Sequence, residues 1–387
     1  MASTIVSVRD LILFGILILS RVDDISAKFP SGCPRCGKGE STLKAVAMLF
    51  RHGDRSPTMS YPLDPYRDYP WPGGYGALSE RGSEEMYGSG LIKSTRYSSL
   101  LSIDCDSDAA CTVDFDNILV FSSAVPRCVE SAESFLDGFL RVDWPSDLIN
   151  VIPQNQDEIL AIPGKLCPKY ESIIATGPSL DSRKFKKVID FRSSKGQEFL
   201  AYLQNHTGLV IDSSTDILFI ADTLFIDEDN DLELPAWTES VFEQYLLPIL
   251  SIVYDALGSS QYMKIRSSAL FEDMANRFDN LIEGLDEQNI VLYSAHDVTL
   301  NGMLHLLGIR DQADARPPYG ASLNLELHDN SKIKSDYEVK LLYYGSYDDQ
   351  NPTEIKIPKC RAPCPYKRFK RNIEPRLIDD YESACSL

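Results

Sequence analysis

Three short apolar runs, each followed by a polar turn and a helical pattern, constrain the fold of this chain more than any other feature. The runs extend from Leu43 to Phe50, from Ile118 to Phe121 and from Ile290 to Tyr293. Continuous apolar runs of this length are typical of strands buried on both faces of a sheet. The repetition of strand, turn and helix therefore predicts an α/β domain with a mostly parallel central sheet flanked by helices.

Helices are expected directly after the second and third runs. Apolar residues recur at helical spacing after Pro126 and again after Asp297, and Gly308 is suited to end the later helix. The positions that carry this periodicity are Val129, Ala132, Phe135, Leu136 and Phe139 in the first helix and Leu300, Met303, Leu304 and Leu307 in the second.

The middle of the chain has a different pattern, which predicts a second, mainly helical domain. Residues 150–238 are rich in loops with scattered helical stretches, and residues 239–285 read as amphipathic helices. We expect the α/β domain to comprise residues 40–149 and 288–387, with residues 150–287 inserted as a cap. Such a cap commonly forms one wall of a cleft beyond the carboxyl ends of the strands.

The N-terminal segment and the charge of the chain indicate an exported protein. The run from Leu11 to Leu19 is shorter than the roughly 20 residues needed to cross a bilayer, so residues 1–27 are predicted to be a signal peptide. No later segment reaches membrane-spanning length, and we expect no membrane span in the mature protein. The net charge of -19 argues against a nucleic-acid partner. It also requires a local cationic pocket if the substrate is anionic.

Nine cysteines in an exported chain predict a disulfide framework, with at least one cysteine left unpaired. Their spacing suggests a bond between Cys105 and Cys111, whereas Cys33 and Cys36 form either a local disulfide or free thiols. No group of cysteines and histidines has zinc-ligand spacing, so no metal site is expected. The sequon at Asn205 predicts glycosylation on a surface loop.

The segment after the first apolar run, RHGDRSP, combines phosphate-binding and nucleophilic side chains. Arg51 and Arg55 can bind phosphate oxygens in bidentate fashion, and Gly53 permits a close backbone approach or a positive φ. An imidazole between two cations resists protonation, so His52 is expected to remain a free nucleophile in mild acid. The alternative is a charged surface loop in which Asp54 neutralises one arginine.

Further candidates follow the other two runs. Arg127, directly after Pro126, is expected at a helix N-terminus, where anions are favoured. The third run leads to His296 and Asp297. Asp297 is either the N-cap of the next helix or a catalytic acid, and His296 is either a site residue or a buried structural histidine.

Together these segments resemble the histidine acid phosphatase branch of the histidine phosphatase superfamily. RHGDRSP and the downstream AHD carry the resemblance, which WPGGYGALS at Trp71, LPAW at Leu234, PPYGASLNLEL at Pro317 and CRAPCPYKRF at Cys360 extend over most of the chain. The resemblance implies that His52 is the nucleophile and Asp297 the proton donor. It implies that the phosphate is bound by Arg51, Arg55, Arg127 and His296, without a metal or cofactor.

The resemblance has further implications for covalent structure and assembly. It implies disulfides between Cys360 and Cys364 and between Cys167 and Cys385, and family members are often homodimers. One departure lies before Arg127, where the family usually carries acidic residues and this chain reads SSAVPR. This change could displace Arg127.

We therefore expect a secreted acid phosphatase that hydrolyses small phosphomonoesters through a phosphohistidine, with a lysosomal location as the alternative. An acidic optimum is expected because Asp297 must be protonated to act as an acid. Two other functions are considered: a phytase-like inositol phosphate phosphatase, which would need extra Lys and Arg facing the cleft, and a weakly active, secreted ligand-binding protein.

Overall fold

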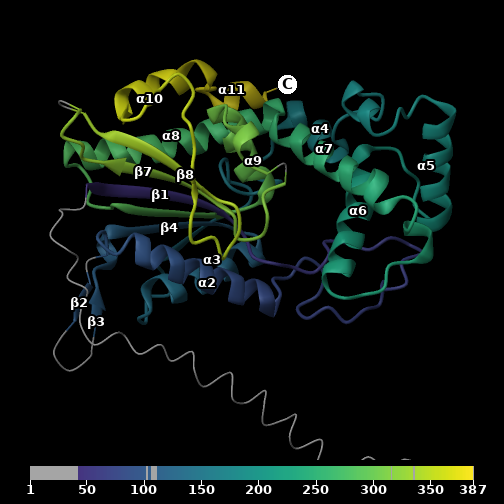
Figure 1. The fold of residues 1–387 in the computed structure, drawn as a ribbon, viewed down its shortest axis with the longest axis horizontal. Helices are drawn as coiled ribbons and strands as arrows, with labels where there is room; N and C mark the ends of the chain where they lie inside the picture. Colours follow the sequence, from purple (N-terminus) through teal and green to yellow (C-terminus); the bar gives the residue numbers. More distant parts are fainter. Residues whose placement is uncertain (1–41, 102, 106–110, 315, 334–335, 387) are drawn as a thin grey trace, which may run out of the picture. The chain divides into compact units, whose positions relative to one another are not determined.

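The computed structural model describes residues 42–101, 103–105, 111–314, 316–333 and 336–386 (Figure 1). The expected signal peptide and the Cys33 and Cys36 pair lie outside these residues. Within them, eight strands form one sheet in the order β10-β8-β7-β1-β6-β4-β5, with β9 beside β8. The strands are β1 (Leu43–Arg51), β4 (Ile118–Ser123), β5 (Ile149–Ile152), β6 (Ile290–Ala295), β7 (Ser322–His328), β8 (Glu338–Tyr344), β9 (Thr353–Glu354) and β10 (Cys364–Pro365).

The three apolar runs form β1, β4 and β6, which lie together in the parallel half of the sheet. In this half β1 pairs with β6, β6 with β4, and β4 with β5, all in parallel. In the other half, β7, β8, β9 and β10 pair antiparallel. The predicted α/β fold class, a central sheet flanked by helices, is confirmed. The sheet is mixed rather than mostly parallel, because three of its strand pairings are parallel and four are antiparallel. The carboxyl ends of the predicted strands meet at one edge.

Helices cover both faces of the sheet, which explains why β1 is apolar without alternation (Figure 1). Ala45, Ala47 and Leu49 belong to one hydrophobic cluster, which includes side chains of the helices on one face. Val46 and Phe50, pointing the other way, join a second cluster with the helices on the opposite face. The helices of the first cluster are α8 (Gln261–Glu283), α9 (Asp297–Leu307) and α10 (Tyr366–Ile373), and those of the second are α2 (Glu80–Arg96) and α3 (Pro126–Leu140).

A third hydrophobic cluster is built mainly from the middle of the chain. Its helices are α4 (Glu171–Thr176), α5 (Ser194–Thr207), α6 (Ser214–Asp229) and α7 (Leu247–Gly258), with a π-helical turn at Phe242–Leu246. Helix α8 contributes to two clusters, since Tyr262 packs in this one and Leu270 packs against the sheet. The division of the chain into a cap and an α/β domain stays a prediction. None of the described helices is long and apolar enough to cross a membrane.

Several shorter elements complete the described structure. They are the hairpin β2 (Ile103–Cys105) and β3 (Cys111–Val113), the C-terminal helix α11 (Tyr381–Cys385), and 3-10 turns at Phe115–Asn117, Pro168–Tyr170, Arg183–Lys187, Ala236–Thr238, Arg310–Gln312 and Glu374–Arg376. The two predicted helix starts and the helix end at Gly308, where φ is 72°, are present.

Two of the expected disulfides are present, joining Cys167 to Cys385 and Cys360 to Cys364. The hairpin register places Cys105 opposite Cys111, but their side chains lie outside the described part of the structure, so that bond stays a prediction. Asn205 is exposed on the last turn of α5 rather than on the expected surface loop.

Candidate active site

The parallel register of β1 and β6 brings the two predicted site histidines together. Arg51 is the register partner of Ala295, so His52 and His296 leave the sheet at equivalent positions. Their ring centroids are 5.6 Å apart at an interplanar angle of 75°, and both residues are buried. The polar residues after separate strands therefore form one cluster at the carboxyl edge of the sheet.

The hydrogen bonds of His52 define which ring nitrogen is free to react. Nδ1 lies 2.8 Å from the carbonyl oxygen of Gly53, which can only accept, so Nδ1 carries the proton. Nε2 therefore presents a lone pair, which accepts a hydrogen bond from Nε of Arg127 at 3.0 Å. Burial, followed by the charges of Arg127 and Arg51, lowers the pKa of His52 well below its usual range. The imidazole is neutral and directed, as a nucleophile requires.

Arg127 remains in the site despite the departure of SSAVPR from the family pattern. Pro126 is the first residue of α3, so Arg127 occupies the second position, in the first turn of the helix. Besides contacting His52, its Nη1 donates to the carbonyl oxygen of Gly76 at 3.3 Å. The loss of acidic residues before Arg127 has therefore not turned its side chain away.

Arg51 is buried and contacts Asp297. Its Nη2 lies 3.0 Å from Oδ2 of Asp297, its Nη1 donates to the carbonyl oxygen of Pro317, and its guanidinium stacks on the ring of Tyr319 at 4.0 Å. Burial raises the pKa of Asp297, but Arg51 and then Arg316 lower it more, and the result is a pKa of about 2.

Asp297 does not act as the N-cap that the sequence offered as one alternative. The N-cap position of α9 is held by His296, and Asp297 is the first helical residue. Its Oδ1 accepts a hydrogen bond from the backbone N–H of Val298, and its Oδ2 faces the arginines. The carboxylate is thus available to the site.

Two charged residues of the site were missed in the sequence analysis. Asp222 in α6 accepts from Nη2 of Arg55 at 2.9 Å and from Nη2 of Arg316 at 2.5 Å. Nε of Arg316 also lies 3.8 Å from Oδ2 of Asp297. Asp222 could have been noticed as an acidic residue within the apolar stretch ILFIADTLFI, and Arg316 because it directly precedes PPYG.

The site has an excess of positive charge and unused donors. Four guanidinium groups, those of Arg51, Arg55, Arg127 and Arg316, face two carboxylates, which leaves two positive charges uncompensated while the histidines are neutral. Nε of Arg51, Nε of Arg55 and Nε of Arg316 are buried without a hydrogen-bond partner within the protein. Buried N–H donors are rarely left unpaired, so this arrangement favours binding of a dianion.

The RHGDRSP segment is buried, which excludes the alternative of a charged surface loop. Asp54 does not neutralise Arg51 or Arg55. Its carboxylate instead accepts from Ser79 and pairs with Arg81, both at the start of α2. Asp54 therefore does not neutralise the positive charges that Arg51 and Arg55 bring to the site.

Gly53 serves a close backbone approach rather than a positive φ. A Cβ atom at Gly53 would lie 2.2 Å from the carbonyl oxygen of Gly82, and a Cβ atom at Gly82 would lie 2.2 Å from that of Asp54. The reactive loop therefore rests directly on the backbone of α2.

His296 is held by polar contacts on the sheet side of the site. Its Nε2 lies 3.2 Å from Oγ of Ser123, and the free thiol of Cys128 lies 3.7 Å from the same nitrogen. Burial, with Arg127 next in effect, lowers the pKa of His296 to about 3. Burial also raises the pKa of the Cys128 thiol to about 11.

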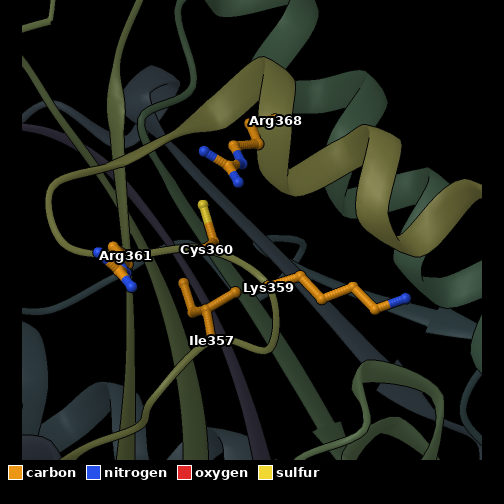
Figure 2. Close-up of a pocket in the computed structure, with 5 residues that line it drawn as sticks. All are labelled: Ile357, Lys359, Cys360, Arg361 and Arg368. Atoms are coloured by element: carbon orange, nitrogen blue, oxygen red, sulfur yellow. The ribbon is translucent and has the colours of Figure 1, made fainter.

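A cavity of about 230 Å³ opens onto these groups and is lined by His52, Arg55, Arg127, His296 and Asp297 at its polar end. A larger hollow of about 650 Å³ lies elsewhere, at Lys359, Arg361 and Arg368 (Figure 2). Its sulfur belongs to Cys360, which is in a disulfide, and its lining contains no histidine, serine or free thiol. In the part of the chain that the structure describes, no cluster of three or more His, Cys, Asp or Glu is placed to hold a metal ion.

Fold and site together define an α/β protein in which strand-end loops surround a neutral histidine with guanidinium groups. The chain belongs to the histidine phosphatase superfamily (branch 2), whose family model matches residues 42–344. It is 25% identical to lysosomal acid phosphatase of Homo sapiens and 26% identical to prostatic acid phosphatase of Homo sapiens, covering 81% and 88% of those proteins and 89% of its own length.

Solved structures of similar fold include two bacterial phytases. The phytase from Citrobacter braakii superimposes with a TM-score of 0.63 at 17% identity, over 89% of this chain and all of the phytase. The apo form of Hafnia alvei phytase gives a TM-score of 0.62 at 17% identity, over 91% of this chain and all of the phytase. At this identity the likeness concerns the fold alone.

Proposed function

We propose that the chain is an acid phosphatase that hydrolyses phosphomonoesters through a phosphohistidine intermediate on His52. Membership of the histidine phosphatase superfamily and similarity to named acid phosphatases support the reaction class, phosphoric monoester hydrolysis. The observation that carries the proposal is the unprotonated Nε2 of a neutral imidazole among guanidinium groups with unpaired N–H donors.

In the first step, Nε2 of His52 attacks phosphorus, and the ester bond to the leaving oxygen breaks. Arg127 releases Nε2 as it binds a phosphate oxygen, and Arg51 and Arg55 bind the others through their unpaired donors. Phosphoryl transfer depends mainly on positioning and on positive charge around the equatorial oxygens, which these groups supply. His296, neutral and 5.6 Å from His52 between ring centroids, adds a donor.

Asp297 protonates the leaving oxygen, and in the second step it accepts a proton from the water that attacks the phosphohistidine. In the free enzyme Arg51 and Arg316 keep the carboxylate ionised. A bound phosphate dianion competes for these arginines and repels the carboxylate, so the pKa of Asp297 rises on binding. Protonation is then favoured in acid, which gives the acidic optimum.

We further propose that the protein acts outside the cytosol, either secreted or in the lysosome, and carries N-linked sugar at Asn205. The disulfide between Cys167 and Cys385 and that between Cys360 and Cys364 support an oxidising compartment. One relative is named lysosomal and another prostatic acid phosphatase.

The test compares wild type with His52→Ala on p-nitrophenyl phosphate at pH 5. We expect kcat to fall at least about 10⁴-fold, as for loss of other enzymatic nucleophiles. Brief incubation with ³²P-labelled substrate, quenched in alkali, should label wild type with an acid-labile phosphate and leave His52→Ala unlabelled. His206→Ala, a histidine change outside the site, serves as the matched control. Equal activity of wild type and His52→Ala would leave only a ligand-binding role.

A further inference from the structure

The cavity that opens onto the reactive groups is apolar over most of its surface. Beyond the polar end, its walls are formed chiefly by aliphatic and aromatic side chains from five helices and one loop. The apolar side chains in this wall include those of Ile162, Ile174, Leu218, Phe219, Leu257 and Met263. The rings of Tyr254 and Tyr262 complete this surface.

Charges are confined to the end where the reaction is proposed to take place. Among the residues that line the cavity, the basic ones are Arg55 and Arg127, and no lysine is present. Arg55 is already paired with Asp222, and Arg127 contacts His52. The remaining polar contacts come from uncharged hydroxyl groups such as that of Thr215, which has no hydrogen-bond partner within the protein.

We propose that the substrate is a phosphomonoester of an apolar alcohol, whose alkyl or aryl group occupies this cavity while its phosphate faces His52. The proposal rests on the phosphatase function proposed above and specifies its substrate class. A leaving group that carried further phosphates would meet Asp222 and apolar walls without cations to neutralise it, and burying such charges is costly. The cavity therefore disfavours a highly phosphorylated inositol.

The size of the cavity limits how far kcat/KM should increase with the length of the substrate's alkyl chain. Ligand pockets are typically about 300–1,000 Å³ and mostly apolar, and this one, at about 230 Å³, is small. It suits one aromatic ring or a short alkyl chain. Each methylene transferred from water into an apolar site improves binding about fourfold, so kcat/KM should rise by about that factor per methylene until the cavity is full.

The experiment measures kcat/KM at pH 5 for ethyl, butyl, hexyl and octyl phosphate, with phenyl phosphate, glycerol 1-phosphate and myo-inositol hexakisphosphate alongside. We expect a steep rise that levels off within the series, with hexyl phosphate well above both polar substrates. A better phenyl than hexyl substrate would identify the occupant as an aryl group. A flat alkyl series, or inositol hexakisphosphate as the best substrate, would overturn the proposal.

Failure of the proposed phosphatase function would give a different result from failure of the inference about the leaving group. If wild type turned over none of these compounds, nor p-nitrophenyl phosphate, the phosphatase function itself would fail. Good turnover without any dependence on chain length would remove only the inference about the leaving group.

A charged substitution in the apolar wall tests the same idea without touching the reactive groups. Ile174→Lys, on α4, should abolish the dependence on chain length and raise KM for hexyl phosphate at least about tenfold, while the inhibition constant of inorganic phosphate stays unchanged. Val210→Lys is the matched control, because Val210 is 70% exposed and does not line the cavity. If Ile174→Lys fails to fold, Leu257→Lys on α7 is the second probe. Unchanged chain-length dependence in the folded variant would contradict the proposal.

Discussion

The guanidinium of Arg51 lies 3.0 Å from Oδ2 of Asp297, and both side chains are almost entirely buried. Arg316 approaches the same oxygen at 3.8 Å. These contacts hold the proposed proton donor in its ionised form until a ligand changes the balance of charge. Substrate binding is therefore proposed to raise the pKa of Asp297, so that its carboxyl group can carry the proton for the leaving oxygen. The arginines and His296, in contrast, bind the phosphate.

Replacing Asp297 with Asn should affect substrates according to their leaving groups. Without an acid, an alkoxide must leave unprotonated, whereas p-nitrophenolate needs little help. Because kcat/KM reports the first step and not hydrolysis of the phosphohistidine, we expect kcat/KM for hexyl phosphate to fall by about 10²–10⁴-fold and kcat/KM for p-nitrophenyl phosphate to fall much less. The inhibition constant of inorganic phosphate, measured in parallel, should stay the same or improve because a nearby negative charge is removed. Equal losses for both substrates would indicate that Asp297 does not donate the proton.

Arg127→Ala should weaken transition-state stabilisation without disturbing the fold. The side chain is only partly buried and donates to Nε2 of His52 and to the carbonyl oxygen of Gly76. We expect kcat/KM to fall by about 10²–10³-fold, as for the loss of other preorganised donors. Arg127→Lys should recover only part of the loss, because an ammonium group cannot bind two oxygens as a guanidinium does. Steady-state kinetics and a thermal melt check both points, and full activity of Arg127→Ala would exclude the residue from phosphate binding.

The buried histidines should make the protein less stable in mild acid. Burial and Arg127 lower the pKa of His296 to about 3, while an unfolded histidine titrates near 6.5. Between these values the unfolded chain binds more protons than the folded one, so stability rises with pH in this window and is lost as pH falls. The slope is about 1.4 kcal/mol per pH unit for each such group.

His296→Gln should remove its share of that slope. Urea unfolding of wild type and variant between pH 4 and pH 6.5 measures the difference. If the two proteins showed the same dependence on pH, His296 would be charged in the folded state, contrary to its position among the arginines.

The two disulfides should differ in their effect on stability because they close loops of different length. Cys167 and Cys385 are 218 residues apart, whereas Cys360 and Cys364 are four apart. On the chain-entropy model, replacing the first pair with serines costs about 5 kcal/mol and replacing the second about 2 kcal/mol. Urea unfolding of the two double variants provides the comparison, with each acting as the control for the other. A larger loss from the short loop would contradict this ranking.

The sequence predicted the edge of the sheet that carries the candidate site, because the burial of a strand and the residues that follow it are local signals. The apolar runs before His52 and His296 predict buried parallel strands, and the register of such strands brings the residues after them together. Arg127 follows from the same reasoning, since it starts the helix after β4. The antiparallel strands β7 and β8 were not predicted, although both are buried in the sheet.

Asp222 and Arg316 could not be assigned to the site from the sequence. Their contacts depend on how α6 packs against the sheet edge, and helix packing follows from shape rather than from a pattern in the chain. Asp222 appears in the sequence only as a polar interruption of an apolar helix. Its partners Arg55 and Arg316 are 167 and 94 positions away in the chain, so these pairings become visible only in the folded structure.

The contact between Gly53 and Gly82 limits how this enzyme can be altered. Both positions exclude a side chain because each would place its Cβ atom inside the other segment's backbone. Even a single methyl group added at either glycine should therefore push the loop that carries His52 away from α2. Two missing side chains, together with the bonds between Asp54 and α2, set the distance between the loop that carries His52 and the helix that supports it.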